Sequence, residues 1–105
     1  MIEAGLAIEK PDVALNVSQY QRTPRLSKVI VYNDDFTPME FVVDVLGDVF
    51  RLGEEYATNV MMRAHYEGKA VLGSYPTDIA ETRVHKLNTE AQKSGYPLLC
   101  EVVSG

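Results

Sequence analysis

Residues 29–46 read V-I-V-Y-N-D-D-F-T-P-M-E-F-V-V-D-V-L, and this stretch decides the fold. Its first four residues are β-branched or aromatic, which suits a strand on a pleated, partly buried surface. The short polar side chains of residues 33–35 favour a turn, because they hydrogen-bond to nearby backbone groups. The sequence therefore predicts a strand that runs directly into a rigid polar turn.

A helix is predicted to begin immediately after this turn. Thr37 is a good N-cap, Pro38 fits the first helical position, and Glu40 can reach back to the cap, which completes a capping box. The polar side chains of the turn are then held between two rigid elements, at the rim of an apolar wall. We expect such a cluster to form a binding site. The wall consists of Val31, Met39 and Val42.

The composition is that of an ordinary globular protein with one modest core. The chain has 105 residues, of which 46% are hydrophobic and 24% charged, with a formal net charge of −5. The negative charge argues against a nucleic-acid partner and against an anionic membrane surface. No apolar run approaches the roughly 20 residues of a membrane span, and no signal peptide is apparent, so we expect a cytoplasmic protein. Cys100 is the only cysteine and is interpreted as a small hydrophobic residue of a strand.

The pattern of apolar residues predicts a flexible N-terminal tail, 1–24, and one folded domain, 25–105. Strands are predicted at 25–32, 70–75 and 97–103. Helices are predicted over 38–51, from 54 to a C-terminal glycine at Gly68, and from 76–77 to 93–95. The order β-α-α-β-α-β indicates an α+β fold, a two-layer sandwich with a three-stranded antiparallel sheet and three helices. The third helix is expected to turn Ile79, Ala80, Val84, Leu87 and Ala91 inward.

The residues themselves leave two interpretations of the polar cluster open. His65 is either a histidine satisfied near a helix end, or it lies beside Asn33 and Asp35, where three hydrogen-bond acceptors would suit an ammonium group. Asp34 and Asp35 are adjacent, so they should point to opposite sides and not converge. No metal-ligand spacing and no nucleophile turn is evident, and His85 is expected at the surface. An enzyme is therefore disfavoured.

Four segments resemble the ClpS adaptor family. They are N-D-D-F-T-P-M-E-F-V-V-D-V-L (33–46), H-Y-E-G-K-A (65–70), A-E-T (80–82) and P-L-L-C (97–100). The resemblance covers roughly residues 25–103 and implies an adaptor of the bacterial N-degron pathway, without catalytic activity, cofactor or metal. Such adaptors bind proteins whose first residue is Leu, Phe, Tyr or Trp and deliver them to the AAA+ unfoldase ClpA, which feeds the peptidase ClpP.

The resemblance also implies roles for particular residues. Asn33, Asp35 and His65 should bind the α-amino group of the substrate. Asp78 and Arg83 should belong to the surface that docks on the unfoldase. Met39 should act as a gate that rejects first residues branched at Cβ. The substrate side-chain pocket should be lined by Val31, Asp34, Thr37, Met39, Val42, Met61, Ala64 and Leu98.

This sequence departs from the family pattern at a few of these positions. Ala64 stands where the family often has a larger valine, so the pocket is expected to be wider or to rank its ligands differently. Asp78 and Arg83 replace the usual Glu and Lys, which keeps the charge but not the shape. These changes leave open a second adaptor paralogue.

Two other functions stay open on the sequence alone. One is an interaction domain of another assembly, since a small β-α-α-β-α-β fold does not fix a function. The other, and weaker, is a small metal-dependent hydrolase that uses Asp34, Asp35 and His65.

Overall fold

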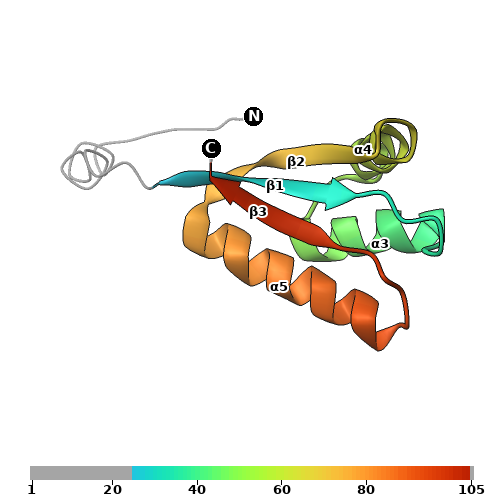
Figure 1. Ribbon diagram of the computed structural model, residues 1–105. Coiled ribbons are helices and arrows are strands. Elements are labelled where there is room, and N and C mark those ends of the chain that lie inside the picture. The colour runs from blue at the N-terminus through green and yellow to red at the C-terminus, as the bar shows by residue number, and fades with distance from the viewer. Residues whose placement is uncertain (1–24, 105) are drawn as a thin grey trace.

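The computed structural model describes residues 25–104. The predicted tail, 1–24, and the terminal Gly105 lie outside the described residues. The structure confirms the α+β class and the order β-α-α-β-α-β (Figure 1). The elements are β1 (Leu26–Tyr32), α3 (Met39–Phe50), α4 (Glu54–Glu67), β2 (Lys69–Pro76), α5 (Thr77–Lys93) and β3 (Cys100–Ser104).

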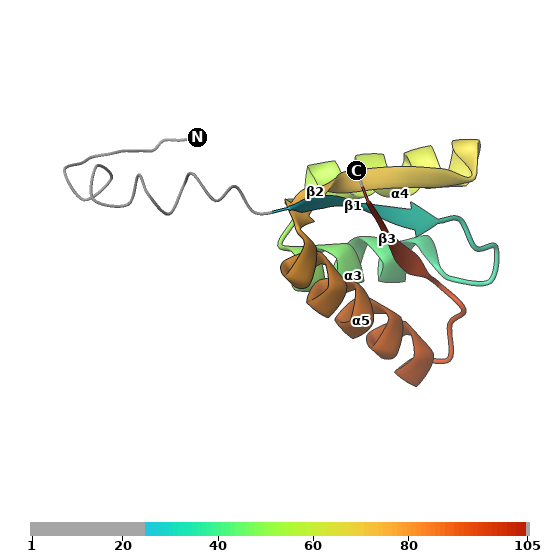
Figure 2. The same ribbon diagram turned by 60° about the vertical axis from the view of Figure 1, so that its left-hand side comes forward.

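The sheet has the order β2-β1-β3, and both pairs are antiparallel. The first strand of the chain is therefore the central one, and Val29 and Val31 on its inner face are fully buried. Seen nearly edge-on, α3 and α5 lie under one face of the sheet (Figure 2). The core forms between these two layers, because each strand turns alternate residues toward the helices.

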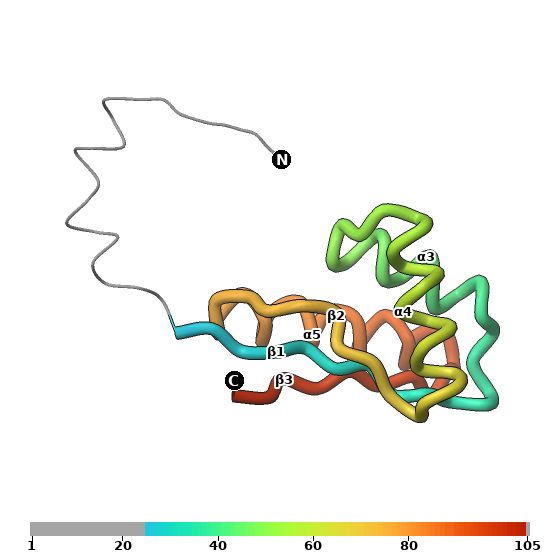
Figure 3. The backbone as a smooth tube through the Cα atoms, turned by 90° about the horizontal axis from the view of Figure 1, so that it is seen from above, coloured from blue at the N-terminus to red at the C-terminus, as the bar shows by residue number. Residues whose placement is uncertain are grey.

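The helix α4 lies along the β2 edge of the sheet (Figure 3). The hydroxyl of Tyr56 donates a hydrogen bond to the carbonyl oxygen of Leu72 at 2.7 Å, which satisfies a backbone group of this edge strand. The opposite edge, β3, lies against α5. Each helix buries one stripe of small or aliphatic side chains. These stripes are Val42, Val45, Leu46, Val49 and Phe50 on α3, Ala57, Val60, Met61 and Ala64 on α4, and Ala80, Val84, Leu87 and Ala91 on α5.

One residue of the predicted inner face of α5 is exposed. Ile79 keeps 41% of its surface accessible, while Ala80 is fully buried. The buried stripe advances by three or four residues from Ala80, and Ile79 precedes it by one, which rotates its side chain about 100° away from the core. The prediction for Ile79 is therefore wrong, because an apolar residue next to a stripe does not belong to it.

The predicted capping box at the start of α3 is also wrong. The helix begins at Met39, and Pro38 occupies the N-cap with an extended backbone, φ −62° and ψ 140°. The hydroxyl of Thr37 donates to Oδ2 of Asp34 at 2.5 Å and does not cap the helix. Donation to the Asp34 carboxylate directs the Thr37 side chain toward the turn, and no side chain accepts a hydrogen bond from the first N–H groups of α3. Thr37 consequently stabilises the turn.

The connection between α3 and α4 differs in detail from the prediction, whereas the end of α4 agrees with it. Arg51, in the left-handed conformation with φ 59°, ends α3, and Gly53 is the N-cap of α4 with an ordinary extended φ. Gly68 ends α4 with φ 94°, a conformation that glycine adopts without strain, and its N–H donates to the Ala64 carbonyl oxygen at 2.8 Å. The prediction of a C-terminal glycine is confirmed.

Candidate functional site

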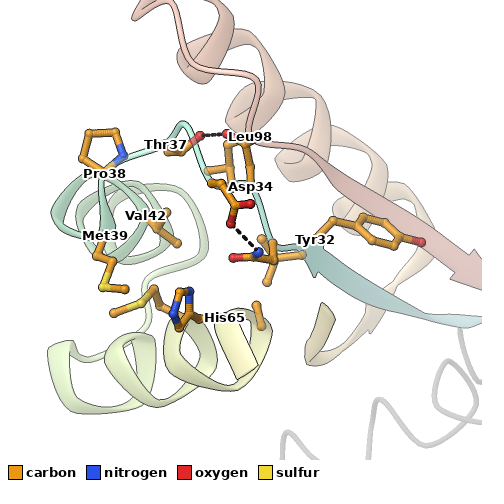
Figure 4. A pocket seen from close by; sticks show the side chains of 13 residues that line it. Tyr32, Asp34, Thr37, Pro38, Met39, Val42, His65 and Leu98 are labelled. Carbon is orange, nitrogen blue, oxygen red and sulfur yellow. Dashed lines mark hydrogen bonds between the residues drawn. The ribbon is translucent and has the colours of Figure 1, made fainter. Parts of the chain in front are cut away.

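A pocket of about 290 Å³ opens where β1 ends, between the start of α3, the second half of α4 and the loop before β3 (Figure 4). Every residue that the resemblance assigned to the substrate amine or to the substrate side chain lines this pocket, although the residues come from three separate stretches of the chain, 31–42, 61–65 and residue 98. The lining residues are Val31, Tyr32, Asn33, Asp34, Asp35, Thr37, Pro38, Met39, Val42, Met61, Ala64, His65 and Leu98.

A backbone hydrogen bond fastens the turn to the end of α4. The N–H of Asn33 donates to the carbonyl oxygen of Gly68 at 2.9 Å, and Gly68 is the residue that ends α4. His65 lies in the last turn of that helix, so fastening the helix end to Asn33 places the imidazole beside the polar turn. The left-handed conformation of Gly68 allows β2 to begin at once, and Lys69 pairs with Tyr32 in the sheet.

The polar side chains of the turn are oriented by one another. The amide Nδ2 of Asn33 donates to Oδ1 of Asp35 at 3.2 Å, which leaves Oδ1 of Asn33 as an acceptor for a ligand. Asp34 instead accepts from Thr37, so the two adjacent carboxylates bond to different partners. The lining includes no lysine or arginine. The rim is therefore negative and rich in acceptors, which suits an ammonium group.

The interior of the pocket is apolar. Val42, Met61, Ala64 and Leu98 are all at least nine-tenths buried, and Val31 forms part of the floor from the centre of the sheet. Met39 is different, because 44% of its surface is exposed at the mouth. It points from α3 toward His65 on α4 (Figure 4). A flexible thioether in this position lies between the solvent and the apolar interior.

Two lining residues, Tyr32 and Pro38, were not predicted. Strand alternation places Tyr32 on the face opposite Val31, and its ring indeed points away from the pocket along the sheet (Figure 4). Its hydroxyl donates to Oε1 of Glu101 at 2.5 Å, and this bond to a carboxylate raises the pKa of Tyr32. Pro38 was assigned to the helix, whereas it precedes the helix at the pocket edge. Thr37 and Met39 were both predicted to line the pocket, and only its position between them could have indicated that Pro38 does so too.

The two residues of the predicted docking surface do not line the pocket. Asp78 and Arg83 lie together with Ile79 and Thr82 at a separate shallow hollow on α5. Nη1 of Arg83 donates to the carbonyl oxygen of Val49 at 2.6 Å. This bond brings a positive charge to the C-terminal end of α3, whose own last turn contains no basic residue. Arg83 therefore links α5 to α3.

Cys100 and His85 lie where the sequence predicted. The Cys100 side chain is buried within the core cluster, and burial raises the pKa of its thiol to about 12. His85 is exposed on α5. Within residues 25–104, no group of three or more His, Cys, Asp or Glu side chains is arranged to hold a metal ion. None of the helices in that range is long and apolar enough to cross a membrane.

The fold and the pocket define a small α+β binding domain whose apolar cavity is rimmed by acceptors. Residues 22–101 match the family described as ATP-dependent Clp protease adaptor protein ClpS. The chain belongs to the ClpS family, which consists of adaptors without enzymatic activity of their own. The family predicted by resemblance is thereby confirmed.

A solved relative agrees with this assignment. The chain is similar to ClpS2 of Agrobacterium tumefaciens, whose structure was determined bound to L-phenylalaninamide. The two share 41% sequence identity with a TM-score of 0.75, and the match covers 78% of this chain and 99% of that chain.

Proposed function

We propose that this protein is an N-degron adaptor that binds proteins beginning with Leu, Phe, Tyr or Trp and delivers them to ClpA for degradation by ClpAP in the cytoplasm. One observation carries the proposal: an apolar pocket and a cluster of acceptors for an ammonium group meet at one mouth. A first residue of a protein combines a free α-amino group and a side chain on the same carbon. The phenylalaninamide bound by the relative has both features, which supports the proposal.

The α-amino group is recognised by the polar rim. Oδ1 of Asn33 and a neutral imidazole of His65 accept hydrogen bonds from the ammonium. Asp35 orients the Asn33 amide through the 3.2 Å bond and adds a negative charge. Hydrogen bonds to a charged group contribute roughly 1.5–3 kcal/mol each, so binding depends strongly on a free, protonated amine.

The side chain of the first residue enters the apolar interior past Met39. Burying a Leu or Phe side chain contributes about 1.5–3 kcal/mol. Ile and Val carry an extra branch at Cβ, which is stiff about χ1 and strikes Met39 at the neck. Leu and the aromatic residues branch one atom later and pass. The combined amine and side-chain contacts lead us to expect micromolar binding.

Delivery requires contact with the unfoldase, for which we propose the α5 surface that includes Asp78 and Arg83. Asp78 is exposed in the first turn of α5, and Ile79 and Thr82 complete the surface. One acidic and one basic side chain lie on this partly apolar patch. Opposite charges on the partner would pair with them and fix the orientation in which the two proteins bind. The support for this partner is the family, whose members are adaptors of the Clp protease.

The proposal is tested with fluorescent peptides that differ only at the first residue. Peptides beginning with Leu, Phe, Tyr and Trp should bind, whereas an Ile peptide and an N-acetylated Phe peptide should not. Binding of the acetylated peptide equal to that of the free one would refute the amine site. Capture of ClpA by the wild-type protein tests the delivery half separately.

A further inference from the structure

One wall of the pocket is formed by a residue of a loop and not by a helix or strand. The apolar side chains predicted to enclose the ligand lie on β1, α3 and α4, except for Leu98. The predicted strand 97–103 begins only at Cys100, so Leu98 precedes β3 and takes no part in its ladder. Leu98 is nevertheless 96% buried, since only 4% of its surface is accessible. Its position must therefore be set by how the chain is fastened on either side.

The part of the loop between α5 and Leu98 is held in place at Tyr96. The N–H of Tyr96 donates to the carbonyl oxygen of Ala91 at 2.9 Å, which extends the hydrogen bonding beyond the end of α5. The Tyr96 ring packs on Phe41 of α3, with ring centroids 4.8 Å apart. This contact ties the start of the loop to the helix that forms the opposite wall of the pocket.

The part of the loop between Leu98 and β3 is held in place by β1 and by Asn88. The N–H of Tyr32 donates to the carbonyl oxygen of Leu99 at 3.1 Å. The side chain of Asn88 on α5 makes two bonds to Cys100: its Oδ1 accepts from the backbone N–H at 2.9 Å, and its Nδ2 donates to the carbonyl oxygen at 3.2 Å. β3 is an edge strand, so these backbone groups face away from β1. The Asn88 amide takes the place of a neighbouring strand.

We propose that Asn88 is a positioning residue that sets the specificity of the pocket by holding Leu98 in place, an inference that rests on the proposed function. Asn88 is not a lining residue of the pocket. It fixes Cys100 two residues after Leu98, and the intervening Leu99 is bound to β1. When both bonds to Cys100 are lost, the chain on this side of Leu98 is held only by its pairing with β1. The Leu98 wall then moves, while the walls on regular elements stay.

The test measures affinities of Leu-first and Phe-first peptides for Asn88→Ala, Leu98→Ala and the double variant. Asn88→Ala should weaken binding about fivefold, equivalent to about 1 kcal/mol, and should change the ratio of the Leu and Phe affinities. Because Asn88 acts through Leu98, its effect should largely vanish in the Leu98→Ala background. The effect of Asn88→Ala should persist in full alongside Met39→Ala, which alters a wall on α3.

Two further variants separate positioning from general stability. Asn59→Ala, the same change at an exposed position of α4, should alter neither affinity nor the ratio. Asn88→Asp keeps the shape and the acceptor for the Cys100 N–H, but its carboxylate faces the carbonyl oxygen that Nδ2 had bonded. It should change the ratio in the same direction as Asn88→Ala, and it provides a folded variant if the alanine form is unstable.

The outcomes are distinct. An unchanged affinity ratio in folded Asn88 variants would overturn the inference alone. So would an undiminished effect of Asn88→Ala in the Leu98→Ala background, because that pattern indicates a loss of overall stability and not a movement of Leu98. A wild-type protein that binds none of the peptides would overturn the proposed function and, with it, this inference.

Discussion

The polar turn at residues 33–37 and the α5 surface of Asp78 and Arg83 use charged side chains in opposite ways. In the turn, Asn33 bonds to Asp35 and Thr37 to Asp34, so the polar groups orient one another and still present acceptors outward. On α5, the Arg83 guanidinium bonds to the backbone of another helix. The comparison teaches that the residues of two proposed binding sites differ in how far the fold depends on them.

The largest effect is expected for ligand binding when the turn loses an acceptor. Asn33→Ala or His65→Ala should each weaken binding of a Phe-first peptide by about 10- to 100-fold, because a hydrogen bond to a charged group is lost. The unfolding midpoint should barely change, since His65 and Asn33 are exposed. Fluorescence anisotropy and thermal unfolding followed by circular dichroism measure both quantities. A folded variant with wild-type affinity would contradict the site.

An intermediate effect is expected at Met39. This uncharged residue restricts the pocket mouth by its bulk and contributes no charge to it. Met39→Ala should raise the affinity for Ile-first and Val-first peptides about tenfold, because the obstruction to the Cβ branch is removed. The affinity for a Leu-first peptide should change less. Competition titrations with unlabelled peptides measure these values, and Met62→Ala on the same protein is a control outside the pocket lining. Continued exclusion of Ile by Met39→Ala would refute the gate.

The smallest effect concerns the α5 surface and tests the comparison directly. Arg83→Ala should lower the free energy of unfolding by about 1 kcal/mol, because the Val49 carbonyl loses its charged donor. Asp78→Asn, which retains a side-chain acceptor for the Ile79 N–H, should stay within about 0.5 kcal/mol of wild type. Urea unfolding gives both values. Equal stabilities would show that Arg83 is as dispensable to the fold as Asp78.

Capture of ClpA by the same two variants sharpens this prediction. Both should bind ClpA more weakly if the α5 surface docks on the unfoldase. Unchanged capture by Asp78→Asn would place the docking surface elsewhere, whereas a loss with Arg83→Ala alone would be explained by the disturbed contact between α5 and α3.

Features that depend on near neighbours in the chain were predictable. The strand before Asn33 and the glycine that ends α4 both follow from patterns over a few residues. The capping box of Thr37 failed although it is local. The hydroxyl had two possible partners within three residues, and the pattern did not show that the Asp34 carboxylate would be preferred.

Features that depend on distant contacts were predictable only by resemblance. Nothing in the spacing of Leu98 indicates that it closes a pocket at the end of β1, because the position follows from the bonds of Leu99 and Cys100 to other elements. Asn88 gave no signal either, since an asparagine within a helical pattern is usually a solvated residue. Tyr32 was predicted only as a strand residue, and its contribution to the pocket edge was therefore missed.

The sequence by itself determined the order of the elements, the polar turn at the end of the first strand and membership of the ClpS family, because periodicity, turn residues and continuous motifs are local properties. Only the tertiary structure decided that the N–H of Asn33 meets Gly68, which brings His65 to the turn, and that Arg83 and Asn88 bond to backbone groups of other elements. Such bonds join residues far apart in the chain. They exist because packing the helices against one face of the sheet leaves particular backbone groups in need of partners.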